Sequence, residues 1–416
     1  MNEQQQPSQL PSSMRYGKSK NTSVEASTTE RQFSAANGAT FDENTNEIRI
    51  PVSSHDGFLD ASQAILSLTI TNTSAVGSEK FTLCSDVACC IDQLRIESGG
   101  TILETIDRYN LYHNHKMLWA SSMAGLNQRS GMGGGPEDGT NTGIEVDIGA
   151  ANAFTGAVRL QSGFLQAHGG KAIPMGIQFE IVLRLGSGQS SFKNTDNVAS
   201  KYTVSNVKWF CPMYRIENPA VMSDYMEVIN STPISLSGQT AKSYISPIQA
   251  GVGVKTAQLN DRSLSLLGVT SILRATATAA ANLNSLEGAL TGVSSFVYNF
   301  DGQKFPTSDI KYSALDCGRA YSQLAKLYND DWSGTVKRSN FVSLTGGQSQ
   351  GSLAVVLKKF SDEELKMVGL NTARNASPSS VEIDCSVDPT ASELISYSIC
   401  ESIYTRLPNG SLKVSN

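Results

Sequence analysis

Residues 91–112 read IDQLRIESGGTILETIDRYNLY, and the fold prediction starts from this stretch. Leu94 and Ile96 alternate with charged residues, which indicates a strand with one buried and one solvent-facing side. The SGG that follows favours a tight hairpin turn into a second strand, TILETI. Beyond Asp107, tyrosine, leucine and tryptophan recur at roughly helical spacing as far as Ala120. The stretch therefore predicts a β-hairpin that runs directly into a helix.

The same order of elements recurs in the second half of the chain. The segment FVYNFDGQKFP (296–306) has a turn signal at Asp301 and Gly302, continues through SDIKY, and leads into a helical stripe over 316–329. Further strands are predicted after the helix in both halves, at 144–148, 176–185 and 202–214 in the first and at 341–345, 352–360, 379–387 and 393–407 in the second. Because no residue-level repeat accompanies this order, the sequence predicts a duplication of architecture only.

Other segments add elements to this outline. EIRIPV (47–52) and QAILSLTITN (63–72) alternate apolar and polar residues ahead of the first hairpin. YTVSNVKWFCPMY (202–214) alternates too, but its phase slips near Asn206, as a β-bulge would produce. A short helix is expected after Ser361, where SDEE offers a capping box.

The composition is typical of a turn-rich, all-β protein. The 416 residues include 55 Ser, 29 Thr and 35 Gly, whereas charged residues make up 17%, below the roughly 25% of ordinary soluble domains. The net charge is -5 and no cluster of Lys or Arg stands out, which argues against a dedicated nucleic-acid-binding protein.

The chain shows no targeting or disulfide pattern. It opens MNEQQQPSQLPSSM, without the basic and apolar regions of a secretory signal. Its longest fairly apolar stretch, 264–290, contains Arg274 and Glu287 and is not expected to span a membrane. The seven cysteines are odd in number and lack C-x-x-C spacing. We therefore expect reduced, mostly buried thiols in a protein made in the cytosol.

Composition divides the chain into three parts. Residues 1–44 are rich in Gln, Ser, Thr and Asn and cannot form a core, so they are either a disordered tail or an arm that orders against a neighbouring subunit. This arm is nearly neutral and therefore unsuited to neutralising packaged nucleic acid. Three prolines in 212–233 indicate a hinge, which gives expected β domains at 45–222 and 223–416.

No catalytic, cofactor-binding or metal-ligating residues are expected. His113 and His115 are two apart in a predicted helix, so they face different sides, and we expect them at the surface or partly buried. GQSQG (347–351) matches the G-x-S-x-G nucleophile motif, but a predicted strand follows it and no histidine lies after His168. The glycine-rich GMGGGP (131–136) lacks the Lys-Ser/Thr of a phosphate loop. The sequence thus predicts a protein that is not an enzyme and uses no cofactor.

Three segments resemble the double jelly-roll major capsid proteins of tailless icosahedral DNA viruses. They are LDASQAILSLTITN (59–72), CIDQLRIESGGTILETIDRYNLY (90–112), and FDGQKFPTSDIKY with AYSQLAKLYND (within 300–330). The resemblance is to the adenovirus-like and tectivirus-like lineage and to the capsid proteins of polinton-like viruses and virophages. It implies an all-β fold of two tandem jelly-roll β-sandwiches, with short helices in the connections.

The resemblance also implies a function. Three copies of such a chain form a homotrimeric capsomer of pseudo-hexameric outline, and these capsomers tile an icosahedral virion shell. The partners are then other copies in the trimer and in neighbouring capsomers, with penton proteins, minor capsid proteins and an internal membrane as further options, and no sequence-specific nucleic-acid binding. The implied location is the virion, after synthesis in the host cytoplasm. Deleting residues 1–44 is expected to leave a folded trimer but to impair shell assembly.

An alternative is a non-enzymatic tandem β-sandwich binding protein of the lectin or adhesin type. It predicts an aromatic-lined sugar site or an acidic calcium loop. The tryptophans, Trp119, Trp209 and Trp332, lie in a predicted helix, a strand and a helix end, and no D-x-D-x-D-G spacing occurs. A monomer that binds glycans would favour this alternative, whereas a trimer or a shell-sized particle would favour the capsid prediction.

Overall fold

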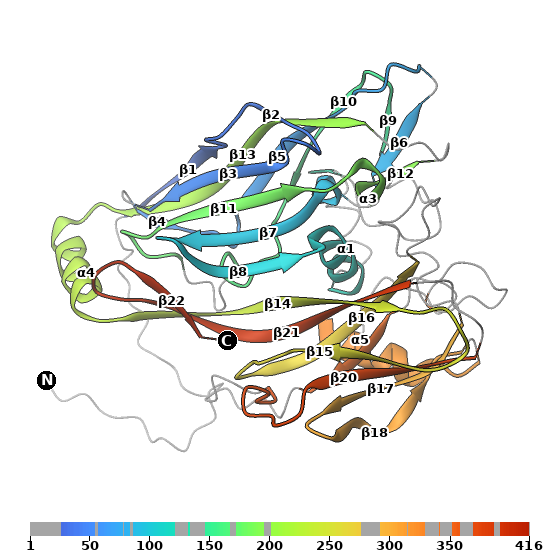
Figure 1. Cartoon of the computed structure of the whole chain (residues 1–416). Coiled ribbons are helices and arrows are strands. Elements are labelled where there is room, and N and C mark those ends of the chain that lie inside the picture. The colour runs from blue at the N-terminus through green and yellow to red at the C-terminus, as the bar shows by residue number, and fades with distance from the viewer. Residues whose placement is uncertain are drawn as a thin grey trace, which may run out of the picture.

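Two β-sandwiches, one from each half of the chain, pack against each other (Figure 1). The first is coloured blue to green and the second yellow to red. The structure is a computed structural model that describes residues 26–54, 57–77, 79–83, 86–120, 132–133, 146–166, 172–194, 201–275, 292–313, 315–328, 341, 352–357, 369–386 and 392–415. Among these residues, no helix is long and apolar enough to cross a membrane.

The first sandwich has two main antiparallel sheets. Their strands, in spatial order, are β1 (Ala26–Ser34), β13 (Tyr202–Ile216), β5 (Ile65–Asn72) and β10 (Ala153–Val158) in one sheet, and β3 (Glu47–Ser53), β11 (Gln178–Leu185), β7 (Ile91–Ser98) and β8 (Thr101–Asp107) in the other. Short strands complete it: β2 (Thr40–Phe41) and β4 (Phe58–Leu59) pair with β13, and β12 (Phe192–Asn194), β6 (Lys80–Leu83) and β9 (Asp147–Gly149) form a small third sheet.

The second sandwich repeats the two main sheets. One contains β14 (Ile234–Ile248), β21 (Ser392–Arg406), β16 (Leu266–Ala275) and β19 (Leu353–Val356), and the other contains β15 (Gly253–Leu259), β20 (Ser379–Cys385), β17 (Val293–Phe300) and β18 (Gln303–Lys311). β22 (Leu412–Ser415) pairs with β21.

The strand order identifies the fold of both halves. Counted along the chain, the eight main strands of each half lie in the orders 1-8-3-6 and 2-7-4-5. The strands therefore pair as 1 with 8, 2 with 7, 3 with 6, and 4 with 5. This is the pairing of one long antiparallel hairpin, with successive pairs placed alternately in the two sheets. This is the jelly-roll arrangement of interlocked Greek keys. The predicted fold class of two tandem jelly-roll sandwiches is confirmed.

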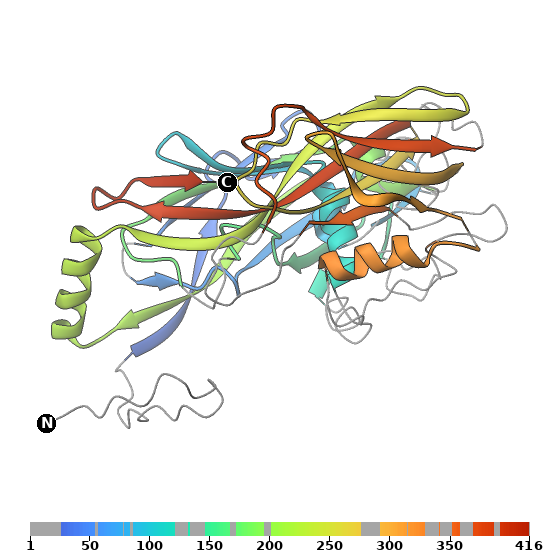
Figure 2. The ribbon, with the colours of Figure 1, turned by 90° about the horizontal axis from the view of Figure 1, so that it is seen from below.

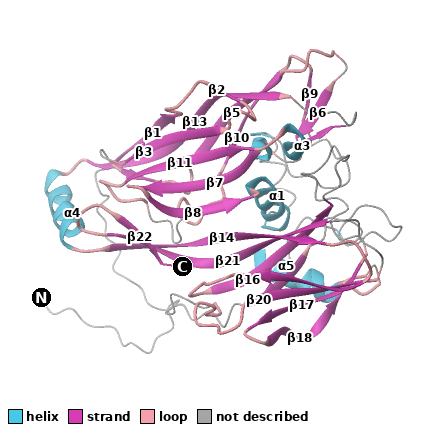
Figure 3. Cartoon of the chain, in the orientation of Figure 1, coloured by secondary structure: helices cyan, strands magenta, loops and turns pink. Residues whose placement is uncertain are grey.

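The helices are short and lie in connections (Figure 3). α1 (Tyr109–Ala120) follows β8 and α5 (Gly318–Tyr328) follows β18, so a helix comes after the fifth main strand in each half. The predicted duplication of a hairpin running into a helix is therefore confirmed. The two helices also contact each other (Figure 2). Two further short helical segments, α3 (Gly188–Ser191) and the 3₁₀ helix Val87–Cys90, belong to the first half.

The predicted hinge at 212–233 is a strand end and a capped helix. β13 continues through Pro212 to Ile216, and α4 (Pro219–Ser231) then leads to β14. The Asn218 side chain accepts hydrogen bonds from the first free N–H groups of α4, and Pro219 occupies its first turn. Of the three prolines, Pro212 lies within β13, Pro219 begins α4 and Pro233 precedes β14, so this stretch connects the two halves of the chain.

The strand patterns bury the residues that the sequence indicated. Leu94 and Ile96 on β7 are fully buried, whereas Arg95 and Glu97 point to the outer face and form an ion pair with an Nε–Oε1 distance of 2.5 Å. On β13 the pairing register with β5 shifts beside Asn206, whose φ of 52° is in the left-handed region. The predicted β-bulge is confirmed.

The structure differs from the sequence prediction at residues 26–34. They form β1, which pairs with β13 along its whole length, from Ala26 opposite Ile216 to Ser34 opposite Lys208. Only Phe33 of this strand is buried, at 8% exposure. β1 is an edge strand that backbone hydrogen bonds hold in place, and it has no apolar face of its own. Its sequence therefore lacks the alternation of apolar and polar residues that marks a strand. These residues therefore belong to the first sandwich and not to a separate arm.

Several predicted features lie outside the described residues. They are residues 1–25 of the arm, the helix after Ser361, the loops 131–136 and 347–351 (except residues 132 and 133), most of the strand 341–345, the end of the strand 352–360, His168 and Trp332.

Candidate functional site at the junction of the jelly rolls

The histidines of α1 are structural and connect to different jelly rolls. Both are fully buried, which corrects the expectation of a surface or partly buried position. The Nε2 of His113 lies 2.8 Å from a carboxylate oxygen of Asp86 in the first jelly roll. The Nε2 of His115 lies 2.6 Å from the Ser352 hydroxyl in the second, and its Nδ1 lies 3.3 Å from the Tyr328 hydroxyl. The prediction that they face different sides of the helix is confirmed.

The rest of α1 is divided in the same way. On the side of the first jelly roll, the Asn110 amide donates hydrogen bonds to the carbonyl oxygens of Cys89 and Ser190. On the side of the second, the Tyr112 ring lies 5.3 Å from the ring of Tyr397. One face of the helix thus completes the first core and the other completes the second.

Burial on all sides explains why α1 has no clean amphipathic pattern. Every side chain described from Tyr109 to Trp119 is buried except that of Lys116, which is partly exposed. A helix packed between two layers needs apolar or hydrogen-bonded residues on its whole circumference. Trp119 shows this at the end of the helix, where its ring packs 5.2 Å from Tyr321 and 5.8 Å from Phe341.

A buried carboxylate makes a second connection. Glu104 on β8 is 4% exposed and accepts hydrogen bonds from the Ser162 hydroxyl and, at 2.9 Å, from the backbone N–H of Gly163, both in the first jelly roll. It also accepts one from the hydroxyl of Thr240 on β14, the first strand of the second. A buried carboxylate that loses these donors would be left unsatisfied, so this group holds the edges of β8 and β14 together.

The two backbones touch where glycines face each other. A Cβ placed on Gly238 of β14 would lie 1.9 Å from the carbonyl oxygen of Gly163. No side chain fits in that space, so both positions require glycine. Nearby, the Tyr397 hydroxyl donates a hydrogen bond of 2.9 Å to the carbonyl oxygen of Arg108. The two jelly rolls are therefore in direct backbone and side-chain contact at these positions.

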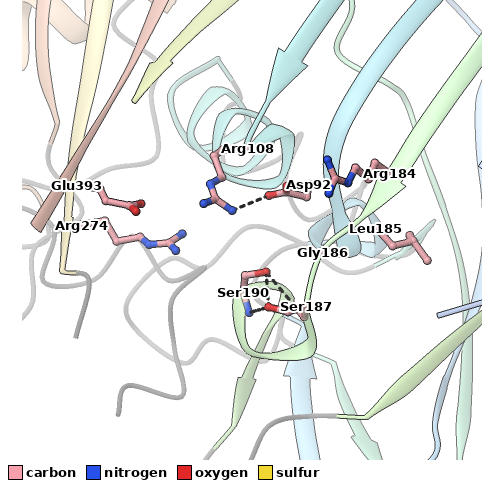
Figure 4. A pocket seen from close by; sticks show the side chains of 9 residues that line it. All are labelled: Asp92, Arg108, Arg184, Leu185, Gly186, Ser187, Ser190, Arg274 and Glu393. Carbon is pink, nitrogen blue, oxygen red and sulfur yellow. Dashed lines mark hydrogen bonds and ion pairs between the residues drawn. The ribbon is translucent and has the colours of Figure 1, made fainter. Parts of the chain in front are cut away.

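One cavity interrupts this packing (Figure 4). It has a volume of about 350 Å³ and is lined by Asp92, Arg108, Arg184, Leu185, Gly186, Ser187, Ser190, Arg274 and Glu393. Residues of both jelly rolls contribute, and the Arg108 guanidinium lies 3.0 Å from the Asp92 carboxylate.

Among the described residues, the metal-ligand types, the cysteines and the tryptophans bear on what a metal site, a reactive thiol or a sugar site would need. They contain no group of three or more His, Cys, Asp or Glu side chains that could hold a metal ion. The six described cysteines are free and buried, and burial raises the pKa of Cys90 to about 12, which leaves it an unreactive thiol. Trp119 and Trp209 are both only 1% exposed, so neither provides an open aromatic surface for a glycan.

These features define a double jelly-roll protein whose two halves are joined by buried contacts. Its sequence matches no protein-family model and no curated protein.

Solved structures of similar fold come from viral capsids. The chain is similar to the capsid protein of virus PBCV-1 (TM-score 0.65, 11% identity, 95% of this chain and 98% of that chain). It is also similar to the Faustovirus major capsid protein (TM-score 0.62, 9% identity, 93% and 92%) and to a chain of the Sputnik virophage (TM-score 0.60, 11% identity, 99% and 92%). The resemblance noted from the sequence is confirmed for the fold.

Proposed function

We propose that this chain is a structural major capsid protein of an icosahedral virus and not an enzyme. The observation that carries the proposal is that two jelly rolls are joined through α1 and Glu104 into one block, in a fold that matches capsid proteins over nearly the whole of both chains. A shell transmits load through its subunits, and a close-packed junction lets each chain present two jelly rolls in a constant orientation.

The proposal includes a division of the chain and a mode of assembly. We assign the first jelly roll to residues 26–216 and the second to 234–415, with α4 between them and residues 1–25 as the arm. Three chains supply six jelly rolls, which gives a homotrimer of pseudo-hexameric outline. Leu315 and Val254 are 88% and 66% exposed in the single chain, and large apolar side chains of this kind are commonly covered on assembly.

In this proposal the protein is made in the host cytoplasm and resides in the virion. Its main partners are other copies of itself, in the trimer and in neighbouring capsomers. Penton proteins, minor capsid proteins and an internal membrane are the further partners that a shell of this kind would offer. The net charge of -5 supports contacts other than with nucleic acid.

Light scattering after size exclusion, followed by electron microscopy, tests the proposal. We expect a stable species of three times the 44.5 kDa chain mass, or a shell-sized particle. A stable 44.5 kDa monomer would contradict it, because a trimeric capsomer buries large obligate interfaces. If that monomer also bound immobilised glycans, the lectin or adhesin alternative would replace the capsid proposal.

A further inference from the structure

We propose that the cavity at the junction binds a multiply charged oxyanion of the phosphate type, held between Arg108 of the first jelly roll and Arg274 of the second. This inference concerns a site within one chain and does not depend on the capsid role. The ligand would connect the two jelly rolls in a space lined by residues of both.

The lining of the cavity suits a small, hydrated anion. Among the described residues that line its 350 Å³, Leu185 is the one with an apolar side chain, and the others are charged, hydroxyl-bearing or glycine. Figure 4 shows the guanidinium groups of Arg108 and Arg274 directed toward the same space, with Ser190 across from them. An apolar ligand would leave these groups without partners, so the chemistry selects a ligand that accepts hydrogen bonds.

The charges around the cavity are not balanced. Among the described lining residues, three arginines face two carboxylates, and Asp92 already pairs with Arg108 at 3.0 Å. Glu393 lies opposite Arg274 in the register of β16 and β21 without forming an ion pair with it in the described part of the chain, and its charge acts to raise the pKa of both Arg274 and Arg108, which leaves one arginine in excess. An excess of positive charge in a confined space attracts an anion and repels a metal cation.

Buried polar atoms at the cavity have no partner. The Nε atoms of Arg108 and Arg274 and one carboxylate oxygen of Glu393 are buried and make no hydrogen bond among the described residues. Burial and, after it, the charge of Arg108 lower the pKa of Arg274, against an opposing effect of Glu393. An anion between the two guanidinium groups would offset their mutual repulsion and accept hydrogen bonds from their terminal N–H groups.

The backbone supports a dedicated position for Arg108. Its φ of 51° is in the left-handed region, which a side-chain-bearing residue rarely adopts. In this conformation its carbonyl oxygen accepts a hydrogen bond from Tyr397 while its side chain reaches the cavity. The free-energy cost of such a strained backbone conformation is usually retained where the residue has a function.

Calorimetric titration of the full-length protein with orthophosphate, at constant ionic strength set by chloride, tests the proposal. We expect saturable binding of one phosphate per chain and a matching rise in melting temperature. Arg274→Gln should weaken the affinity by about tenfold or more, since it removes a charged hydrogen-bond donor. Arg49→Gln is the control, because Arg49 lies on the outer face of β3 in an ion pair with Glu47 at 2.6 Å, and it should keep the wild-type affinity.

Three further results would overturn the proposed anion site or identify its ligand. Absence of saturable binding to the wild-type protein up to about 10 mM phosphate would overturn the proposal, whatever the folding of the variants. Equal weakening in Arg49→Gln would also overturn it, because binding would then be non-specific. A parallel titration with a nucleoside monophosphate distinguishes the source of the ligand: tighter binding than orthophosphate identifies a phosphoryl group on a larger molecule, and weaker binding identifies the free ion.

Discussion

Glu104 is a buried carboxylate whose hydrogen bonds reach both jelly rolls. Its donors are the Ser162 hydroxyl and the Gly163 N–H on one side and the Thr240 hydroxyl on the other. Three residues from two separate segments are thus held by one side chain. Glu104 contributes to stability mainly because its removal would leave several buried donors without an acceptor, and less through any single hydrogen bond.

We predict that Glu104→Ala lowers the free energy of unfolding by about 3 kcal/mol or more, since several buried donors lose their acceptor. Glu104→Gln should cost less, because the hydroxyls of Ser162 and Thr240 can rotate to accept from the new amide. Urea denaturation followed by tryptophan fluorescence measures both. Glu97→Ala is the matched control on the solvent face of β7, where an exposed ion pair is worth about 1 kcal/mol or less. Equal losses at the two positions would contradict the special role of Glu104.

His115 makes the stability of the junction depend on pH. Burial lowers its pKa from 6.5 to about 3, so it stays neutral in the folded protein. In the unfolded chain it takes up a proton below its ordinary pKa. The unfolded state therefore binds more protons between these two values, and stability must fall as the pH decreases through this window.

We predict that His115→Gln removes part of this pH dependence. Between pH 6.5 and 5 the wild-type protein should lose about 1.5 kcal/mol of stability through this one group, and the variant should not. Urea midpoints measured across this range test the difference. Trp119→Phe, one turn further along α1, has no titrating group and should keep the wild-type slope. An unchanged slope in His115→Gln would show that other groups are responsible.

At the scale of elements, β1 and β14 show how a strand forms without a sequence signal. β1 is polar apart from Phe33, and β14 (ISLSGQTAKSYISPI) includes a glycine and a proline. Both run along strands with strong patterns, β13 and β21, which supply the partner for their backbone hydrogen bonds. Pairing places β1 in its sheet without an apolar face, whereas β14 combines pairing with a buried face that includes Leu236, Ala241 and Ile248.

We predict different effects for two truncations at the N-terminus. Removal of residues 1–25 should leave the melting temperature unchanged, whereas removal of residues 1–44 deletes β1 and β2 and should lower it by several degrees, because the edge of β13 and the ring of Trp209 become exposed. Differential scanning calorimetry compares the two. The expectation of a folded trimer after removal of residues 1–44 stays a prediction, and equal melting temperatures of the two truncated chains would contradict a stabilising role of β1.

At the scale of the whole molecule, α1 couples the two jelly rolls. Because its two faces complete two cores, neither core can open without exposing part of the helix. We therefore expect the wild-type chain to unfold in a single calorimetric transition.

We predict that Trp119→Ala separates this transition into two, since it removes the contacts of α1 with Tyr321 and Phe341 in the second jelly roll. Trp209→Ala is the matched control. Its ring packs between Phe33 and Phe179 inside the first jelly roll, so the variant should lose a similar 3–5 kcal/mol, about the usual cost of a buried aromatic, without a second transition. Two transitions already present in the wild-type protein would contradict the coupling.

Local patterns in the sequence by themselves determined the fold class and the duplication of the architecture in the two halves of the chain. Alternation on β7 and β11, the turn at Asp301 and Gly302, and the slip at Asn206 are properties of neighbouring residues, and each appears in the structure as predicted. Pattern and turn chemistry act over a few residues, so a single sequence is enough to recognise them.

Only the tertiary structure decided how the two halves meet. Glu104 and Thr240 are 136 residues apart, and His115 and Ser352 are 237 apart, and no local pattern pairs them. Burial of α1 on all sides removed the periodicity that would have marked its role, and the requirement for glycine at Gly163 and Gly238 arises only when their backbones touch. The junction and its cavity are made by contacts between distant segments, and such contacts exist only once both jelly rolls have folded.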